Sequence, residues 1–298
     1  MDDQTPLLEG IELGGTKAIA VLARGRTIVA HESFPTTADP AATLAAAVAV
    51  IVGWHAQAPL AAIGIASFGP VALDPQSPSY GQILDTPKPG WAGFDVLGSV
   101  RRAIDVPLAI DTDVNAAALA EGRWGGSARC RVHAYVTIGT GVGGGIVVDG
   151  QPLHGFLHPE IGHMRVPRVA GDAFAGACPF HGDCVEGLVA GPALAARTGL
   201  AGADIADDHP VWGNVAQELG DFFANMLVSF APERIALGGS VVLGRPLLLA
   251  GVHAVVARRL GRYLPVTGMT PESRIALTML GADAGPLGAI ALAERALG

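Results

Sequence analysis

A chain of 298 residues is long enough for one large or two medium domains, and 50% hydrophobic against 15% charged residues excludes intrinsic disorder. The net charge of −8 argues against nucleic-acid binding, because proteins that bind nucleic acids usually present a basic surface. The N-terminal sequence lacks the basic and apolar regions of a signal peptide, and Ala-rich stretches such as 41–52 are too short to cross a bilayer. We therefore expect no membrane association.

The first half of the chain predicts three short strands, a helix and a further strand. The three strands are expected at 8–13, 18–23 and 27–31, and the sequences between them, GGTK and RGR, have the length of hairpin turns. Residues 41–56 predict a helix because they are rich in alanine. The apolar residues 61–67 predict a buried strand.

The second half repeats this order. Strands are predicted at 132–138 and 145–148 around a glycine loop, and Asp149-Gly150 predicts a hairpin turn after them. Longer helices and short strands follow, at 210–230 and 246–260 and at 235–237 and 275–278. IELGGTKAIAV and VTIGTGVGGGIVV share the order strand, glycine loop, strand. This internal repeat indicates two similar α/β halves facing a cleft, which is a common ligand site.

Both glycine loops are candidates for phosphate binding, because glycine lets backbone N–H groups approach phosphate oxygens. In residues 10–17 the order is Gly-Thr-Lys and a strand follows, which excludes a Walker A loop. Gly139, Gly141 and Gly144 match the pattern GxGxxG, but a strand follows them as well, which excludes a Rossmann dinucleotide site. We therefore predict two phosphate-facing hairpins.

The segment VPLAIDTDVNAAA predicts a buried strand that runs into a helix, with Asp113 at or near the start of that helix. Asp113 could act as the helix cap, a task that Asn115 could share. Alternatively, the helix N-terminus could keep the Asp113 carboxylate ionised and able to accept a hydroxyl proton. In phosphoryl transfer, orienting the hydroxyl matters more than strong basicity. Asp111 is the rival base, and periodicity does not choose between the two.

Cys178, His181 and Cys184 form a Cys-x-x-His-x-x-Cys cluster in a chain with only three cysteines. Thiolate and imidazole ligands at this spacing suit a tetrahedral zinc ion, whereas a disulfide or unlinked thiols are the alternatives. His163 is the candidate fourth ligand; water in its place would make a zinc hydrolase. Glu160 would share a helical face with His163, and this pair suits a polyhydroxylated ligand. Thiols reserved for a metal indicate a reducing cytoplasm.

With these motifs assembled, the chain resembles the ROK family (repressors, open reading frames, kinases) over nearly its whole length. IELGGTK resembles the first phosphate loop of the family, TDVNAAA its catalytic-aspartate segment, TIGTGVGGG its second phosphate loop and LGGSV its adenosine-side loop. HPEIGH resembles the sugar-binding acid and histidine, and the Cys/His cluster resembles the zinc loop. FGPVALD, SPSYG and TPKPGW resemble the fructokinase branch.

The resemblance implies an α/β fold of two actin-like, ribonuclease-H-like domains around a central cleft. The N-terminal domain is expected at residues 1–116 and the C-terminal domain at 117–298, with the last helix packing back on the first domain. The implied activity is ATP-dependent phosphorylation of the 6-hydroxyl of a hexose, with fructose expected and glucose, mannose or N-acetylmannosamine as alternatives. A sugar-responsive transcriptional repressor is less expected, because family repressors carry an additional N-terminal helical domain and here a strand is predicted within about ten residues of Met1.

The resemblance also assigns roles to residues. Asp113 becomes the general base in preference to Asp111. The residues expected to face the sugar are Glu160, His163 and Glu186, and the ligands of a structural Zn²⁺ are His163, Cys178, His181 and Cys184. The residues expected to bind ATP with Mg²⁺ are Gly14, Gly15, Thr16, Lys17, Thr140, Gly141, Pro192, Gly238, Gly239 and Ser240. Glu12 and Thr112 stand where many members carry Asp and Asn, so a part for Glu12 in organising Mg²⁺ is left open. A homodimer is expected.

Overall fold

The computed structural model describes residues 5–262 and 270–298. Contacts divide the described residues into two compact units. Unit 1 takes its residues from Met1–Gly125, Gly150–Pro159 and Ala282–Gly298, and unit 2 from Gly126–Asp149 and Glu160–Gly281. The boundary expected between residues 116 and 117 falls inside helix α3 (Asp113–Trp124), and the whole of this helix groups with unit 1.

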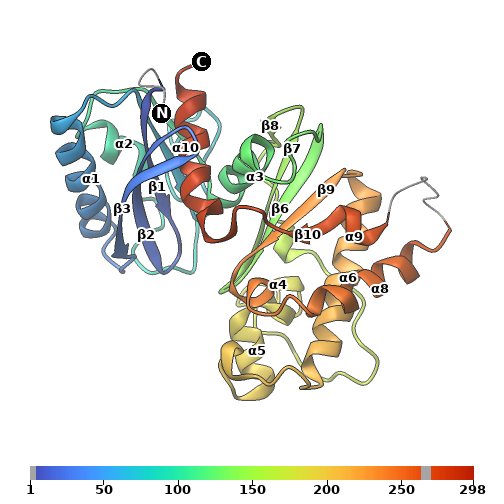
Figure 1. Cartoon of the computed structure of the whole chain (residues 1–298). Coiled ribbons are helices and arrows are strands. Elements are labelled where there is room, and N and C mark those ends of the chain that lie inside the picture. Colours follow the sequence, from blue (N-terminus) through green and yellow to red (C-terminus); the bar gives the residue numbers. More distant parts are fainter. Residues whose placement is uncertain (1–4, 263–269) are drawn as a thin grey trace. The chain divides into compact units, whose positions relative to one another are not determined.

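Unit 1 is built on a mixed sheet with the strand order β3-β2-β1-β4-β5, and Figure 1 labels its strands β1, β2 and β3. Its strands are β1 (Leu7–Leu13), β2 (Lys17–Arg24), β3 (Thr27–Pro35), β4 (Ala62–Ser67) and β5 (Leu108–Thr112). β1 pairs antiparallel with β2 and parallel with β4. Leu7, Ile11 and Leu13 of β1 pack into one core cluster, and Leu8 packs into another. This is expected because successive side chains of a strand point to opposite faces of the sheet.

Helices cover both faces of this sheet. α1 (Pro40–Gln57) and α2 (Val96–Arg101) contribute to the core cluster that contains Ile11 and Leu13. α10 (Ala284–Ala296) packs with α3 and against β1 and β4, and its Ile290 enters the cluster that contains Leu8. Gly10 and Gly64 make this packing possible, because a Cβ at either position would collide with Ala289 of α10. The two glycines therefore let the C-terminal helix lie directly on the sheet.

α1 is the one helix in the described residues that is long and apolar enough to pass a test for a membrane span. Its 18 residues extend the helix expected at 41–56 by one residue at each end, and the Asp39 side chain caps it by accepting a hydrogen bond from the Ala42 N–H at 3.0 Å. Leu44, Ala47 and Ile51 of α1 pack into the core of unit 1. This packing is typical of a helix that covers a sheet in a globular domain.

Unit 2 contains a sheet in which the order is β10-β9-β6-β7. These strands are β6 (Val132–Ile138), β7 (Val142–Val148), β9 (Arg234–Gly238) and β10 (Ile275–Leu277). β6 forms a hairpin with β7 and pairs in parallel with β9, which pairs in parallel with β10. This is the arrangement of β1, β2, β4 and β5 in unit 1, so the internal repeat seen in the sequence is present in the topology.

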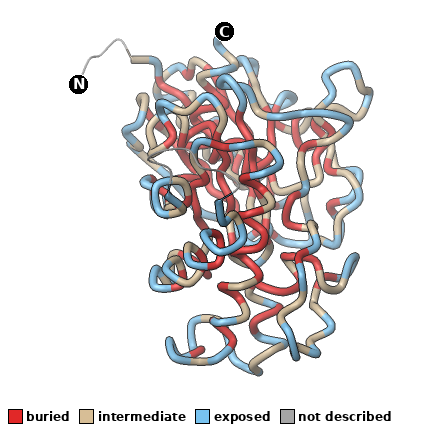
Figure 2. Tube along the Cα trace, turned by 90° about the vertical axis from the view of Figure 1, so that its right-hand side faces the viewer, coloured by how far each residue is buried: buried red, intermediate tan, exposed pale blue. Residues whose placement is uncertain are grey.

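The turn after β7 is formed by Asp149 and Gly150, which both have positive φ, as a two-residue hairpin turn requires. The short strand β8 (Gln151–Pro152) follows it. The helices of unit 2 are η1 (Ile161–His163), α4 (Val185–Val189), α5 (Gly191–Thr198), η2 (Gly202–Asp204), α6 (Val211–Ser229), α7 (Ser240–Leu243), α8 (Leu248–Leu260) and α9 (Pro271–Arg274), and η3 (Gly281–Asp283) precedes α10. Figure 2 shows buried residues in the interior and exposed ones in the connecting turns.

Glu9 interrupts the apolar pattern of β1. Its side chain is 0% exposed in a strand flanked by Leu22 of β2 and Ile63 of β4, and neither carboxyl oxygen has a hydrogen-bond partner among the described residues. Burial raises the pKa of Glu9 to about 9. The folded protein therefore holds this carboxyl protonated at neutral pH.

We expect the buried Glu9 to make the protein less stable as pH rises. Its folded pKa is raised above the ordinary value of 4.5, so its contribution to stability is complete below pH 4.5 and is lost as pH rises towards 9. The loss is at most about 1.4 kcal/mol for each pH unit. Urea unfolding between pH 5 and 8 should show Glu9→Gln gaining stability relative to the parent as pH increases. Glu32→Gln, on exposed β3, is the control; a constant difference between Glu9→Gln and parent would contradict the expectation.

Candidate active site and metal centre

The first glycine loop is an exposed hairpin between β1 and β2. The Gly14 N–H donates to the Lys17 carbonyl at 3.0 Å, and Gly15, Thr16 and Lys17 are exposed. Thr36 holds the loop from the side, since its N–H donates to the Thr16 carbonyl at 2.9 Å and its hydroxyl to the Gly14 carbonyl at 2.8 Å. The loop thus presents small residues and an ammonium group on a fixed backbone.

Asp113 is the first residue of α3, and neither it nor Asn115 caps the helix. The cap is Thr112, whose hydroxyl accepts the Asn115 N–H at 3.1 Å. The Asp113 carboxylate accepts the Val114 N–H at 2.9 Å, which favours its ionised form, but burial and the charge of Glu12 outweigh this and raise its pKa to about 7. The carboxyl is therefore poised to exchange a proton near neutral pH.

Asp111 is largely occupied by groups of the protein. Its buried carboxylate accepts the Thr112 N–H and the Asn115 side-chain amide, both at 2.7 Å, and lies 3.0 Å from Nε2 of His154. The hydrogen bond to Asp111 raises the pKa of His154. Asp111 thus ties the segment after β8 to the start of α3, and its carboxylate has little capacity left for a substrate proton.

Glu12 of β1 is the charged neighbour of Asp113. Burial raises its pKa to about 7, although the nearby Lys17 ammonium lowers it. The carboxylate rests against Gly285 at the start of α10, where a Cβ would collide with it. Within the described residues, Oε2 of Glu12 is buried without a hydrogen-bond partner. Two neighbouring carboxyls with raised pKa values fit a divalent cation, whose charge would favour their ionised forms.

The second glycine loop, between β6 and β7, borders a cavity of about 590 Å³ inside unit 2. β6 and β9 are parallel neighbours, so the loops that follow them lie at the same edge of the sheet, and Gly139 adjoins Ser240. The Gly191 N–H donates to the Gly139 carbonyl at 2.8 Å and brings α5 to the same place. The cavity is lined by Thr140, Pro192 and Ser240. A cavity at the carboxyl ends of parallel strands is a typical ligand site.

Three other predicted nucleotide residues of unit 2 are not among the residues that line this cavity. Gly238 is buried against Tyr135, and Gly239 has φ +88° and lies on the backbone of Ile138, so both serve close packing. Gly141 lies beside Glu186. Trp212 and Arg245 are among the lining residues that the sequence did not indicate. The Arg245 guanidinium lies 4.4 Å from the Trp212 ring, and no local motif signals a contact between residues so far apart in sequence.

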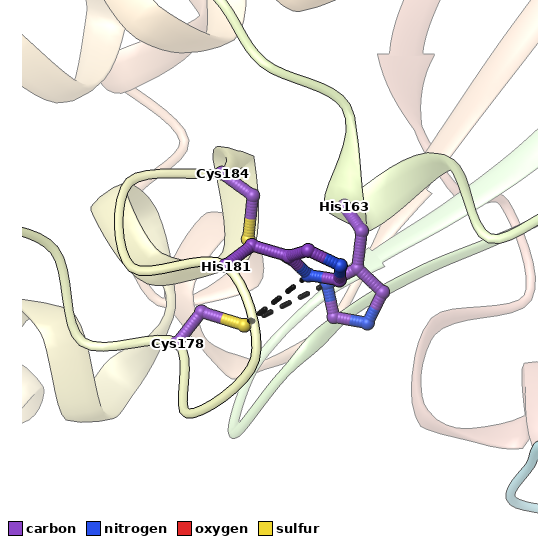
Figure 3. A group of neighbouring side chains, drawn as sticks. All are labelled: His163, Cys178, His181 and Cys184. Carbon is purple, nitrogen blue, oxygen red and sulfur yellow. Dashed lines mark hydrogen bonds between the residues drawn. The ribbon is translucent and has the colours of Figure 1, made fainter.

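Two thiols and two imidazoles converge in unit 2 (Figure 3). The Cys178 sulfur lies 3.8 Å from Nδ1 of His163 and 3.8 Å from Nδ1 of His181, and the Cys184 sulfur lies 3.5 Å from Nδ1 of His163. Zinc–sulfur and zinc–nitrogen bonds of about 2.3 and 2.0 Å in a tetrahedron would place such ligand atoms about 3.5 Å apart. The four groups therefore fit a tetrahedral metal ion with no position left for water, which argues against a zinc hydrolase.

The backbone around Cys178 shapes this cluster. Cys178 and Gly182 exchange two backbone hydrogen bonds, of 3.1 and 2.9 Å, and Gly182 takes φ +64°, which turns the chain sharply between His181 and Cys184. Both cysteines are free. Burial raises the pKa of the Cys184 thiol to about 11, and a bound divalent ion would act against this by favouring the thiolate.

The residues expected to face a sugar lie beside the cluster. Glu160 precedes and His163 ends the 3₁₀ turn η1, so the helical spacing predicted for them is present as a single tight turn. Glu186 of α4 accepts the Val142 N–H at 3.0 Å and is close enough to His163 for its charge to raise the pKa of that imidazole, although burial lowers it more. Because Nδ1 of His163 faces the sulfurs, Nε2 is left for another partner.

A sequence model described as ROK family matches residues 8–296. The chain belongs to the ROK family. A fructokinase from Pediococcus pentosaceus is 40% identical over 98% of this chain and 99% of its own length, and a fructokinase from Zymomonas mobilis subsp. mobilis is 41% identical over 96% of each.

Solved structures agree with this membership. The ROK hexokinase from Thermus thermophilus superposes with a TM-score of 0.79 at 26% identity, covering 97% of this chain and 98% of the other. A ROK family glucokinase from Streptomyces griseus in complex with glucose and AMPPNP gives a TM-score of 0.76 at 25% identity, covering 97% and 99%. The predicted family and the α/β class with two actin-like domains are therefore confirmed.

Proposed function

We propose that this ROK protein is an ATP-dependent hexose 6-kinase and that its physiological substrate is fructose. The relatives named fructokinase support the substrate, and the glucokinase solved with glucose and AMPPNP supports the reaction type. The state of Asp113 carries the mechanistic part of the proposal. Its pKa of about 7 suits a general base at neutral pH, whereas Asp111 already accepts three hydrogen bonds.

In the proposed reaction the 6-hydroxyl oxygen attacks the γ-phosphorus of ATP, and the bond to the bridging oxygen of ADP breaks. Asp113 accepts the hydroxyl proton as the new O–P bond forms. Glu160 and Glu186 accept hydrogen bonds from sugar hydroxyls, and Nε2 of His163 bonds a further one. These contacts would orient the sugar, and orientation is the main contribution that a protein makes to phosphoryl transfer.

The residues of the first glycine loop, Gly14 to Lys17, are proposed to bind the phosphates, and so are Thr140 and Gly141 of the second loop. The cavity lined by Pro192 and Ser240 would hold the nucleoside, and Gly238 and Gly239 would position Ser240 there by packing closely on Tyr135 and Ile138. Mg²⁺ bound with ATP would neutralise charge on the phosphates. Glu12 is a candidate Mg²⁺ ligand, because its pKa is raised and its Oε2 has no hydrogen-bond partner among the described residues.

We further propose that the Cys/His cluster holds a structural Zn²⁺ through His163, Cys178, His181 and Cys184. The ion would fix the imidazole of His163, and through it the sugar side of the site. A cytoplasmic location fits free thiols used as metal ligands. A homodimer is proposed from the family resemblance, and sedimentation of the purified protein tests it.

A sugar panel tests the function. ADP release is coupled to a detector and measured with fructose, mannose, glucose and N-acetylmannosamine, in the presence of ATP, Mg²⁺ and protein of known zinc content. We expect fructose to have the highest kcat/KM. Dominant turnover of N-acetylmannosamine would contradict the substrate, and an absence of turnover with every hexose would contradict the kinase itself. Binding to DNA in a gel shift would favour a repressor.

A further inference from the structure

The chain uses lysine at only two positions, Lys17 and Lys88, although it has 19 lysines and arginines in total. Arginine and lysine differ in chemistry, since arginine presents a broad planar fork and lysine a compact point charge with three donors. The positions of the two lysines are therefore informative in a protein that uses arginine at its other basic positions.

Both lysines contribute to the first glycine loop. Lys17 ends the loop in sequence. Lys88 lies 71 residues later, yet its Nζ donates to the Gly15 carbonyl at 2.5 Å and to the Thr36 carbonyl at 3.2 Å. Thr36 is the residue that holds the loop through Gly14 and Thr16. Of the only two lysines of the chain, one is thus part of this hairpin of unit 1 and the other donates hydrogen bonds to its backbone.

Packing and hydrogen bonds hold the segment that carries Lys88 in place. Trp91 is fully buried, and its indole N–H donates to the Thr37 carbonyl at 2.7 Å, which anchors the segment beside β3. Gly90 has φ +81° and lies against the Ala38 carbonyl, where a side chain would collide. Phe68 lies under the ammonium, with its ring centre 6.0 Å from Nζ. The motif TPKPGW therefore combines an anchor, a turn and a projecting cation.

The ammonium of Lys88 retains capacity for an anion. It has three N–H donors, and the structure accounts for two, both directed at carbonyls that carry no net charge. Partial burial lowers the pKa of Lys88, which shows that the charge lacks some of its hydration. An anionic oxygen at the third donor would restore that lost stabilisation.

We propose that Lys88 is a second phosphate-binding cation of the first glycine loop: two of its donors fix the Gly15 and Thr36 carbonyls, and the third binds an oxygen of the ATP triphosphate. The inference rests on the proposed kinase function for the identity of the anion. It assigns to the TPKPGW motif a role in nucleotide binding that the branch resemblance left without a function.

Protection from acylation tests this contact directly. With only two lysine side chains, modification by an N-hydroxysuccinimide ester at pH 8 can be followed at each by peptide mass spectrometry. We expect AMPPNP with Mg²⁺, at ten times its dissociation constant, to slow acylation of Lys88 by about tenfold, and fructose alone to leave it unchanged. Inorganic tripolyphosphate should protect in the same way. Unchanged Lys88 acylation with bound AMPPNP would overturn the proposal.

Kinetics of Lys88→Met supply the second measurement. We expect KM for MgATP to rise about ten- to hundredfold, as for loss of a charge-assisted hydrogen bond, and KM for the hexose to stay within about twofold. Arg102→Met, which removes an exposed charge of the same unit, should leave both constants unchanged. A parental KM for MgATP in Lys88→Met would refute the contact, and so would an equal rise for both substrates in a folded variant.

The two experiments separate this inference from the proposed function. Protection by AMPPNP or tripolyphosphate needs no turnover, so protected Lys88 in a protein that phosphorylates no hexose would retain the anion site and reject the kinase. Fructose phosphorylation with unprotected Lys88 would retain the kinase and reject the anion site. Circular dichroism of Lys88→Met establishes whether that variant is folded, and the acylation experiment uses the unaltered chain.

Discussion

Asp113→Asn is expected to lower kcat for hexose phosphorylation by about 10²–10⁴-fold, the usual contribution of a general base. The amide has nearly the same shape but cannot accept the hydroxyl proton, so the dissociation constant of the hexose should change little. In the parent, log kcat/KM for MgATP should rise with pH and level off above about pH 7. The pKa of Asp113 is raised to about that value, and only the ionised carboxylate is active. The residual activity of the variant should lack this rise.

Asp111→Asn is the matched control, because it makes the same chemical change two residues earlier. Asp111 accepts hydrogen bonds from the Thr112 N–H, the Asn115 amide and His154, so its loss should lower the free energy of unfolding by about 1–3 kcal/mol. The pH dependence of kcat/KM should survive. If Asp113→Asn kept parental turnover, or if Asp111→Asn alone abolished the rise with pH, the assignment of the base would be wrong.

Features encoded over short stretches were predicted well from the sequence. The hairpins were located because alternating apolar residues and glycine turns are local signals, and β1 and β6 begin within one residue of the expected positions. β3 ends at Pro35, whereas the prediction ended it at residue 31. The prediction stopped early because most of the last residues of the strand are exposed and show no apolar pattern. β7 begins at Val142, whereas the prediction began it at residue 145. The prediction began late because three consecutive glycines inside the strand resemble a loop.

Features that depend on contacts distant in sequence were not predicted. The expected effect of the helix N-terminus on Asp113 is outweighed by burial and by Glu12, which lies about 100 residues earlier in the chain. Nothing in residues 111–113 shows that the His154 side chain occupies Asp111. The Thr112 cap of α3, by contrast, is a local contact with the Asn115 N–H, and it was missed because Asp113 and Asn115 are also preferred cap residues. The lysine at position 88 was noted only as part of a branch motif, since its hydrogen bonds to Gly15 and Thr36 arise from tertiary folding. The Cys/His spacing, by contrast, is local and was sufficient to propose the ligand set.

Removal of zinc is expected to destabilise unit 2 by several kcal/mol. Structural zinc contributes about 10–16 kcal/mol to small zinc-finger peptides, and the effect here should be smaller because unit 2 has its own apolar core. Cys184→Ser removes the fully buried ligand, so one equivalent of zinc should fall to near zero by elemental analysis. The melting temperature should fall, and KM for the hexose should rise because His163 loses the ion that orients it.

Cys130→Ser is the control, because Cys130 lies outside the ligand cluster and should retain zinc, stability and activity. X-ray absorption of the parent should report two sulfur and two nitrogen neighbours at tetrahedral distances. A water ligand in place of one imidazole would reopen the hydrolase alternative. A Cys178–Cys184 disulfide detected by mass spectrometry, or a zinc-free protein as stable as the purified parent, would show that the two thiols and two imidazoles converge for a reason other than metal binding.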